Sequence, residues 1–155
     1  MADQLETDKK FMKIALEEAQ MGYDEGGIPI GSVLVSSDGT ILGRGHNMRI
    51  QKSSPTLHAE MSALESASRL PAKTYSTATI YTTLSPCDMC TGAILLYKIP
   101  RVVMGENKTF VGGEELLRSR GVEVVNLDDD GCFGLLQRFI KARPGDWGED
   151  IGEEK

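Results

Sequence analysis

The sequence lacks the features that mark membrane and secreted proteins. No stretch approaches the ~18 consecutive apolar residues that a membrane-spanning helix needs. Residues 1–20 are acidic and follow a helical pattern, without the apolar block of a secretory signal. We therefore expect a cytoplasmic protein, which could also reach the nucleus by diffusion.

Basic residues are scarce as well. Lysine and arginine total 17 against 23 aspartate and glutamate residues, the net charge is -6, and no run holds more than two basic residues. Proteins that grip a phosphate backbone usually present a basic face. The composition therefore disfavours nucleic acid as a partner and favours a small-molecule substrate.

Cysteine and histidine are few, with three and two residues respectively. An odd number of cysteines does not make a disulfide framework, and Cys87 and Cys90 lie too close in the sequence to join distant segments. In a reducing compartment, such a pair more often binds a metal or carries redox chemistry.

The 155 residues contain no internal repeat, low-complexity segment or linker, which predicts a single domain over residues 1–155. The predicted helices cover residues 8–23, 56–69, 86–97, 114–120 and 132–142, with Pro55 and Pro86 at two helix entries. The predicted strands cover residues 30–35, 40–46, 78–84, 101–106 and 122–127, and residues 143–155 form a tail. A hairpin followed by alternating helices and strands indicates an α/β fold, with a mixed sheet covered by helices on both faces.

Two short motifs carry the chemistry: His-Ala-Glu at residues 58–60 and Pro-Cys-Asp-Met-Cys at residues 86–90. Cys87 and Cys90 at a helix start project from one face and can share a metal, and the positive end of the helix favours their thiolates. His58 offers a third ligand from the start of another helix. Two thiolates and one neutral imidazole suit zinc, and three protein ligands leave one position for water.

Glu60 is the informative residue. Positions two apart inside a helix point to different sides, so His58 and Glu60 converge only if the first turn of the helix meets the metal end-on. Zinc lowers the pKa of bound water from ~16 toward ~7, and a carboxylate beside that water, but not bound to the metal, is a natural proton carrier. H-x-E combined with P-C-x-x-C is the signature of zinc-dependent deaminases.

A structural zinc module is the non-enzyme alternative. A lone C-x-x-C is commonly redox-active or half of a structural site, and a closed zinc site needs a fourth protein ligand. Among the remaining His and Cys, only His46 and Cys132 are available, and neither has ligand-like spacing. We expect His46 to end a strand and bond locally, and Cys132 to be a core or surface thiol.

Longer segments carry a resemblance: residues 25–31 (EGGIPIG), 43–49 (GRGHNMR), 82–94 (TTLSPCDMCTGAI), 105–107 (GEN), 143–144 (RP), 146–147 (DW) and 149–153 (EDIGE). On these segments, the chain resembles the fungal (yeast-type) cytosine deaminases of the zinc-dependent cytidine and deoxycytidylate deaminase superfamily. The zinc motif alone would also fit cytidine, tRNA-adenosine, guanine or deoxycytidylate deaminases, whereas the tail is more specific. The resemblance covers nearly the whole chain.

The resemblance implies hydrolysis of cytosine to uracil and ammonia in pyrimidine salvage, by a homodimer with one Zn²⁺ per chain. A zinc-bound hydroxide would attack C4 while Glu60 protonates N3 and then passes a proton to the departing amine. 5-Fluorocytosine should also be accepted. The implied fold is a three-layer α/β/α sandwich around a five-stranded mixed sheet. A tRNA-adenosine deaminase, or another nucleoside or base deaminase of the superfamily, is the alternative enzyme, and no membrane partner is expected.

The resemblance also assigns residues to the substrate. Asn47 would bond the N1/O2 edge of the base, and the backbone N–H of Ala59 would add a donor to O2. Asp150 would accept from the exocyclic amine, which the Ser85 carbonyl could also receive. The residues that would cover the ring or line the pocket are Phe110, Trp147, Ile151, Ile30 and Leu84. Without the resemblance, Asn47 could equally be a turn residue, and the tail could equally be a solvated end.

Two positions depart from the family pattern. Ala59 stands where glycine is common, but its backbone donor survives, so we expect little consequence. Gly148 follows Trp147 where an aromatic is expected, which suggests a looser lid. Neither departure replaces a metal ligand or Glu60.

Overall fold

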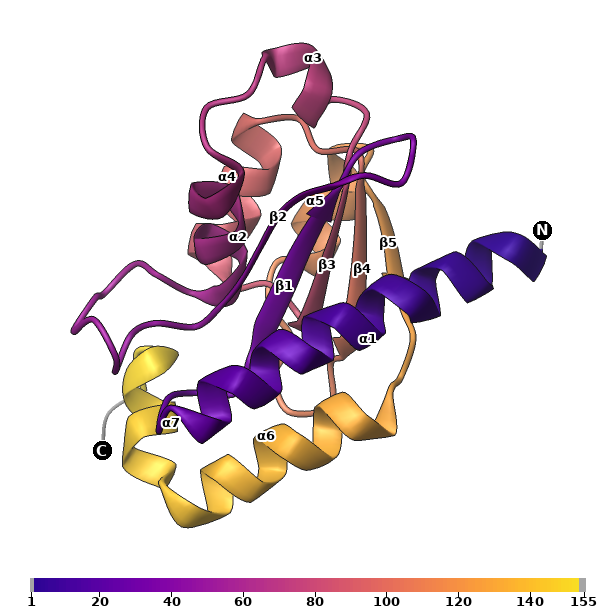
Figure 1. The fold of residues 1–155 in the computed structure, drawn as a ribbon. Helices are drawn as coiled ribbons and strands as arrows, with labels where there is room; N and C mark the ends of the chain where they lie inside the picture. The colour runs from indigo at the N-terminus through magenta and orange to yellow at the C-terminus, as the bar shows by residue number, and fades with distance from the viewer. Residues whose placement is uncertain (1, 154–155) are drawn as a thin grey trace.

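The computed structural model describes residues 2–153 and holds a five-stranded mixed sheet between two layers of helices (Figure 1). The strands are β1 Gly31–Val35, β2 Ile41–His46, β3 Thr79–Leu84, β4 Arg101–Glu106 and β5 Glu123–Asn126, in the order β2-β1-β3-β4-β5. β1 pairs antiparallel with β2 and β3, whereas β3, β4 and β5 are parallel. The predicted α/β fold and its five-stranded mixed sheet are confirmed.

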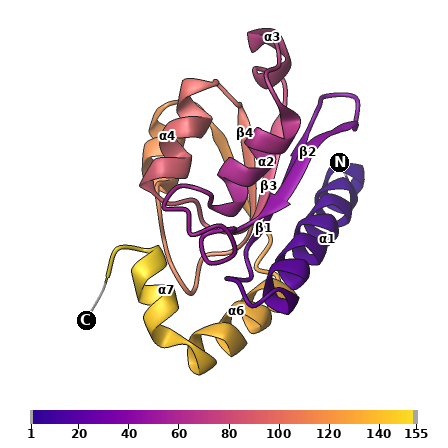
Figure 2. The same ribbon diagram turned by 60° about the vertical axis from the view of Figure 1, so that its left-hand side comes forward.

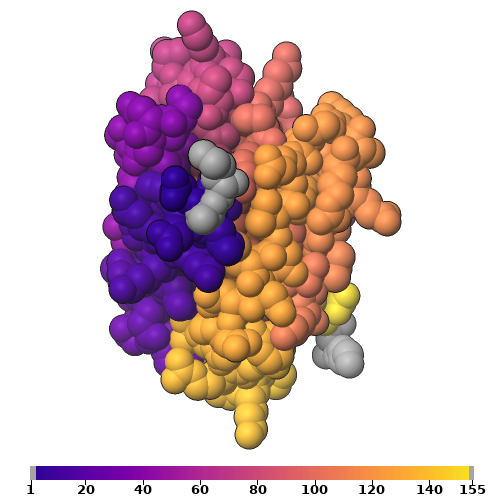
Figure 3. Space-filling model, turned by 90° about the vertical axis from the view of Figure 1, so that its right-hand side faces the viewer, coloured from indigo at the N-terminus to yellow at the C-terminus, as the bar shows by residue number. Residues whose placement is uncertain are grey.

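The helices lie on both faces of the sheet. Within the described residues they are α1 Ala2–Asp24, α2 Ala59–Ala67, α3 Ala72–Tyr75, α4 Asp88–Leu96, α5 Glu114–Ser119, α6 Asp130–Ala142 and α7 Pro144–Asp150. α2, α4 and α5 cover one face, and α1 and α6 cover the other (Figures 1 and 2). Figure 3 shows indigo α1 against the orange C-terminal third of the chain, so the two ends of the sequence close this second layer together. None of the helices described is both long and apolar enough to cross a membrane.

The sheet is buried on both faces because its central strands are apolar at consecutive positions. Successive side chains of a strand point to opposite faces. On β1, Leu34 therefore packs under α2 and α4, and Val33 under α1; Ile80 and Tyr81 divide in the same way on β3. Each fully buried side chain of this size contributes ~1.5–3 kcal/mol to folding. This apolar pattern fixes the strands that carry the site.

Glycines let the helices approach the sheet closely. A β-carbon at Gly31 would collide with the backbone carbonyl of Ala15 on α1, and one at Gly43 with that of Ala63 on α2. Both contacts involve backbone, so a larger residue would push the helix away from the sheet. These two positions explain part of the glycine content of segments 25–31 and 43–49 in structural terms.

The predicted starts of two helices are wrong in an instructive way. α2 begins at Ala59 rather than at residue 56, and α4 at Asp88 rather than at Pro86. His58 and Cys87 are the N-cap residues, with extended backbone (ψ 166° and 178°). An N-cap residue stands just outside its helix, so both side chains project from helix ends toward the same point.

Other boundaries differ because their signals are tertiary or weak. The predicted tail contains α7, with Pro144 at a first-turn position. α6 starts two residues earlier than predicted, because the Asp129 side chain accepts the backbone N–H of Cys132 as an N-cap (2.9 Å). α1 begins earlier than residue 8, and the single-turn α3 was not predicted.

Candidate functional site

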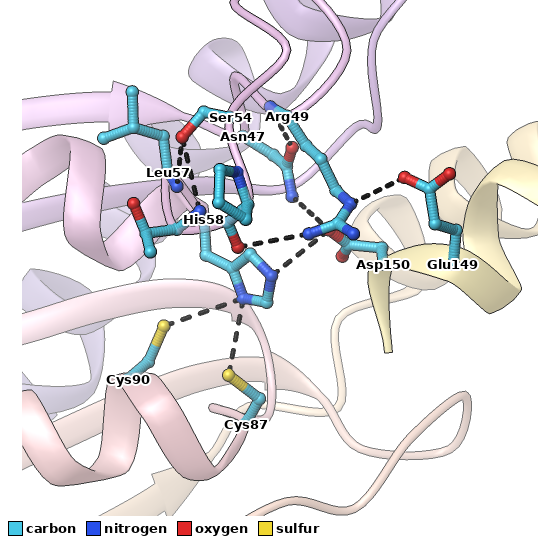
Figure 4. A network of polar contacts seen from close by, with 11 residues as sticks. Asn47, Arg49, Ser54, Leu57, His58, Cys87, Cys90, Glu149 and Asp150 are labelled. Carbon is cyan, nitrogen blue, oxygen red and sulfur yellow. Dashed lines mark hydrogen bonds and ion pairs between the residues drawn. The ribbon is translucent and has the colours of Figure 1, made fainter. Parts of the chain in front are cut away.

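The three predicted metal ligands converge at the carboxyl end of β3. His58 precedes α2, and Cys87 and Cys90 lie at the start of α4. Their ligand atoms all lie within 4.8 Å of one another. The Nδ1 atom of His58 is 3.4 Å from the Sγ atom of Cys87 and 3.8 Å from that of Cys90 (Figure 4).

These distances fit a tetrahedral zinc ion. Zn–N bonds of ~2.05 Å and Zn–S bonds of ~2.3 Å in tetrahedral geometry separate the nitrogen from each sulfur by about 3.6 Å. The observed distances, 3.4 and 3.8 Å, bracket this value. Among the described residues, the group able to hold a metal consists of these three, so one coordination position stays open.

The cysteines are electrostatically prepared for a cation. The pKa of Cys87 is lowered to about 4, mainly by the hydrogen bond with Cys90 and further by the contact with His58. Burial acts in the opposite direction. Cys87 is thus a thiolate at neutral pH. The hydrogen bond with Cys87, together with burial, raises the pKa of Cys90. Metal binding removes that remaining proton and requires a neutral His58 imidazole, because thiolate and neutral imidazole are the ligating forms.

Glu60 lies on the first turn of α2 with only 4% of its surface exposed. Burial raises its pKa to about 7, against the opposing effect of the His58 ring. A carboxyl group with a pKa near neutrality both accepts and donates protons readily. The end-on approach of α2 therefore places this carboxyl group next to the metal ligands, and its role as a proton carrier stays a prediction.

A cavity opens onto this cluster, with about 300 Å³ of empty space when its open mouth is included. Its lining contains His58, Glu60 and Cys87 together with predicted substrate residues: Ile30, Ala59, Leu84, Ser85, Phe110, Trp147, Asp150 and Ile151. Most of the lining is apolar, as in small-molecule sites generally. Two further predicted site residues, Asn47 and Cys90, adjoin this lining without belonging to it.

Asp150 connects α7 with the metal cluster. Its Oδ1 atom is 3.2 Å from the Nε2 atom of His58 and accepts a hydrogen bond from the Nδ2 atom of Asn47, also at 3.2 Å (Figure 4). The Oδ1 atom of Asn47 accepts from the backbone N–H of Arg49 (2.9 Å). A carboxylate on the far nitrogen of a metal-binding histidine fixes the orientation of the ring. Sequence reasoning gave Asp150 a substrate role and missed this second contact.

Ser85 is held by a buried carboxylate that sequence reasoning also missed. The Ser85 hydroxyl donates to Glu114 (2.7 Å) and accepts from the backbone N–H of Gly112 (2.9 Å). Asn107 donates to the same carboxylate. These bonds fasten the 107–113 loop, which carries Phe110 into the cavity, to the end of β3. An acidic residue at the start of a short helix gave no signal of this role.

The two other candidate ligands lie elsewhere. His46 ends β2 and bonds Glu18 through Nδ1 and Glu25 through Nε2, each at 2.8 Å. Cys132 is buried in the core beneath α1, where burial raises the pKa of its thiol above the ordinary value. Neither belongs to the metal cluster, and Cys132 is the core thiol that was one of its two expected roles. His46 ends a strand as expected, but the expectation that it bonds locally is wrong, because Glu18 and Glu25 lie 28 and 21 residues away in the sequence.

The structure explains why position 148 holds a glycine. A β-carbon there would lie 2.9 Å from the backbone carbonyl oxygen of Glu153, and the Gly148 carbonyl accepts the Glu153 N–H (2.7 Å). Glycine thus lets the chain fold back after α7. An aromatic side chain at this position would need the backbone at residue 153 to shift.

Comparisons with known proteins agree with this geometry. A family model described as the cytidine and deoxycytidylate deaminase zinc-binding region matches residues 5–106. The chain is 65% identical over 146 residues to the cytosine deaminase of Candida albicans, which covers 94% of this chain and 97% of that protein.

Two further matches are with proteins whose names refer to deaminases of transfer RNA. The tRNA-specific adenosine deaminase of Streptococcus pyogenes is 40% identical over 147 residues, covering 88% of this chain and 92% of its own. A solved structure from a study of A-to-I editing by tRNA:A34 deaminases has a TM-score of 0.69 at 30% identity, and the match covers 83% of this chain and 99% of that one.

Proposed function

Because the chain belongs to the zinc-binding family of cytidine and deoxycytidylate deaminases, we propose that it hydrolyses cytosine to uracil and ammonia. The observation that supports this most is a three-ligand cluster beside a buried glutamate, at the base of a small, mostly apolar cavity. His58, Cys87 and Cys90 would hold the zinc ion, which would supply a Lewis acid for the activation of water at neutral pH. The protein's own residues must do the rest.

Glu60 moves the protons. It takes one proton from the attacking water and delivers it to N3 of the ring. It then takes the proton of the new hydroxyl group on C4 and passes it to the amine, so that the C4–N bond breaks, ammonia leaves and the C4 carbonyl of uracil forms. A pKa of about 7 suits both directions of transfer. Burial of the carboxyl group also keeps bulk water from competing for the proton.

The polar residues of the pocket orient the base. We assign the N1/O2 edge to Asn47 and the backbone N–H of Ala59, and the exocyclic amine to Asp150 and the Ser85 carbonyl. The Ser85 hydroxyl is occupied by Glu114 and Gly112, which leaves its carbonyl as the group for substrate. The Asn47 side chain is completely buried, so its partners are fixed before substrate arrives.

The cover of the cavity selects a free base. Phe110, Trp147 and Ile151 line it, and Trp147 is only 9% exposed. A ribose on N1 would point at Asn47, whose amide is held by Asp150 and by the backbone of Arg49, and room for the sugar would require these bonds to break. 5-Fluorocytosine fits because fluorine is little larger than hydrogen.

The test is ammonia release from cytosine, 5-fluorocytosine, cytidine, adenosine and guanine, compared side by side. We expect turnover of the first two compounds. Preference for cytidine would contradict the proposal, and so would a lack of turnover of cytosine by the zinc-loaded protein.

A tRNA-adenosine deaminase is the second candidate, favoured by the similarity to the Streptococcus pyogenes enzyme. Such an enzyme holds a polyanion, and its affinity falls steeply with salt. With a net charge of -6, we expect no tRNA complex at micromolar protein. A gel shift at low salt tests this, and a tight complex would reverse the ranking.

The homodimer remains part of this proposal. Its support is a set of exposed apolar side chains at the end of α4 and around α5: Leu96, Tyr97, Val111 and Leu116. Analytical ultracentrifugation tests it, with a sedimenting species of one chain as the contrary result. Three further points stay predictions: a role in pyrimidine salvage, a cytoplasmic location and a single domain. Growth on cytosine tests the first, cell fractionation the second and limited proteolysis the third.

A further inference from the structure

Arg49 occupies a position that the reaction itself does not explain. It lies in the connection between β2 and α2, and its side chain is only 20% exposed although arginine is usually a surface residue. Its backbone is tied on both sides, since its N–H donates to the Asn47 side chain and its carbonyl accepts from Ser54 (3.0 Å). The backbone of Arg49 is therefore fixed next to a proposed substrate residue.

The guanidinium reaches across to α7. Its Nε atom donates to the Oε1 atom of Glu149 (2.9 Å), and one terminal nitrogen donates to the Pro55 carbonyl (3.1 Å) (Figure 4). The same Nε atom is 3.8 Å from the Oδ1 atom of Asp150. The planar fork of arginine serves its own loop and the distant helix together, which the single ammonium of lysine cannot reproduce.

The charge of Arg49 also matters for Asp150. That carboxylate is buried, with 2% of its side chain exposed, and among the described residues its ion pairs are with Arg49 and His58. A buried carboxylate without a cationic neighbour is strongly destabilised. A neutral His58 bound to a metal would leave Arg49 as the charged partner of Asp150.

We propose that Arg49 is a positioning residue: it fastens α7 over the pocket through Glu149 and thereby sets the place of Asp150. It touches neither substrate nor metal and acts through these two acidic residues. The effect on turnover rests on the proposed function, whereas the effect on the place of α7 does not.

The single tryptophan of the chain makes the second effect measurable. Trp147 lies on α7 and is buried against the cavity, so its fluorescence reports whether the helix is seated. In Arg49→Ala, we expect red-shifted emission and stronger quenching by acrylamide than in the unchanged protein. Asp146→Ala is the matched control, because Asp146 is on the same helix and pairs with Arg143 (2.7 Å) instead of with the loop. The control should keep the original emission.

Kinetics on cytosine separate positioning from general stability. We expect kcat/KM to fall at least ~10-fold in Arg49→Ala and by up to ~5-fold in Glu149→Ala. The double variant should be no worse than Arg49→Ala, because both changes remove one interaction. Arg49→Lys should recover part of the loss, and the thermal midpoint should not follow the order of the kinetic losses.

Two results would overturn the proposal. One is Trp147 emission in Arg49→Ala that matches Asp146→Ala; the other is a double variant whose losses in kcat/KM multiply. If the unchanged protein fails to deaminate cytosine, the proposed function is wrong, but the fluorescence comparison still decides whether Arg49 seats α7.

Discussion

The base of the pocket is made by His58, Glu60 and Cys87 at the starts of α2 and α4, with Cys90 completing the metal cluster, whereas its cover is α7, near the end of the described chain. The helices of the base pack directly on the sheet and share its apolar core. The cover is tied to the body of the protein in part by side-chain bonds between residues about one hundred positions apart, such as Asn47 with Asp150.

This difference teaches how stability and access are divided. Moving the base would require the core to open, which costs the global free energy of unfolding. Moving the cover requires the loss of a few polar contacts and of the packing of Trp147 and Ile151. We therefore expect the chemistry to take place on the rigid part, and entry and release to occur where opening costs less free energy.

The largest expected effect comes from removing a metal ligand in the base. Cys87→Ser or His58→Ala should reduce zinc from one ion per chain to nearly none and abolish measurable turnover, because three ligands leave no redundancy. Metal analysis of the purified variants checks this. Cys132→Ser and His46→Ala are the controls and should keep zinc; metal loss from either would place the missing ligand outside the cluster described here.

The next effect separates the metal from the proton carrier. Glu60→Gln should keep zinc and the fold but lose ~10⁴-fold in kcat, the upper end for a general acid–base group, because one residue serves both proton transfers. Glu65→Gln, an exposed position on the same helix, should be silent. A Glu60→Gln enzyme with half the original rate would remove this residue from the mechanism.

A smaller effect tests whether base and cover are coupled. Asp150→Asn should weaken zinc binding ~10–100-fold, because the carboxylate that orients His58 is lost. The rate of zinc transfer to a chelator measures this, with Asp146→Asn as the control on α7. Equal rates in the two variants would mean that the cover acts on substrate alone.

The smallest expected effect concerns His46, which ends β2 directly before Asn47. The hydrogen bond with Glu18 is the main cause that raises the pKa of His46, with Glu25 adding to it against burial. A group whose pKa is raised by folding stabilises the protein fully below its unfolded value, about 6.5, and loses that stabilisation as the pH rises through the folded value. Unfolding by urea across pH 6–9 should show a loss of about 1 kcal/mol, which His46→Gln should remove. An unchanged pH dependence in that variant would assign it to other groups.

Much of this molecule follows from local sequence. The runs of consecutive buried residues on β1 and β3 indicate a sheet covered on both faces, and the helical spacing of α1 predicts one of the covering helices. Each of these patterns is complete within one element. The metal ligands and Glu60 were found for the same reason, since each motif spans five residues or fewer. Even the wrong helix starts at residue 56 and Pro86 are errors of two or three positions, decided by whether His58 and Cys87 adopt helical or extended backbone.

Only the tertiary structure decided the contacts of the cover and of the 107–113 loop. The pairing of Arg49 with Glu149, the contact of Asp150 with His58, and the support of Ser85 by Glu114 join segments that no short-range pattern relates. A charged residue in a loop reads as solvated until the chain brings its partner to it, and a seven-residue helix such as α7 forms through packing rather than through its own propensity. The sequence by itself thus determined which atoms perform the chemistry, and the fold decided what closes over them, because closure depends on distances across the molecule that only a folded chain defines.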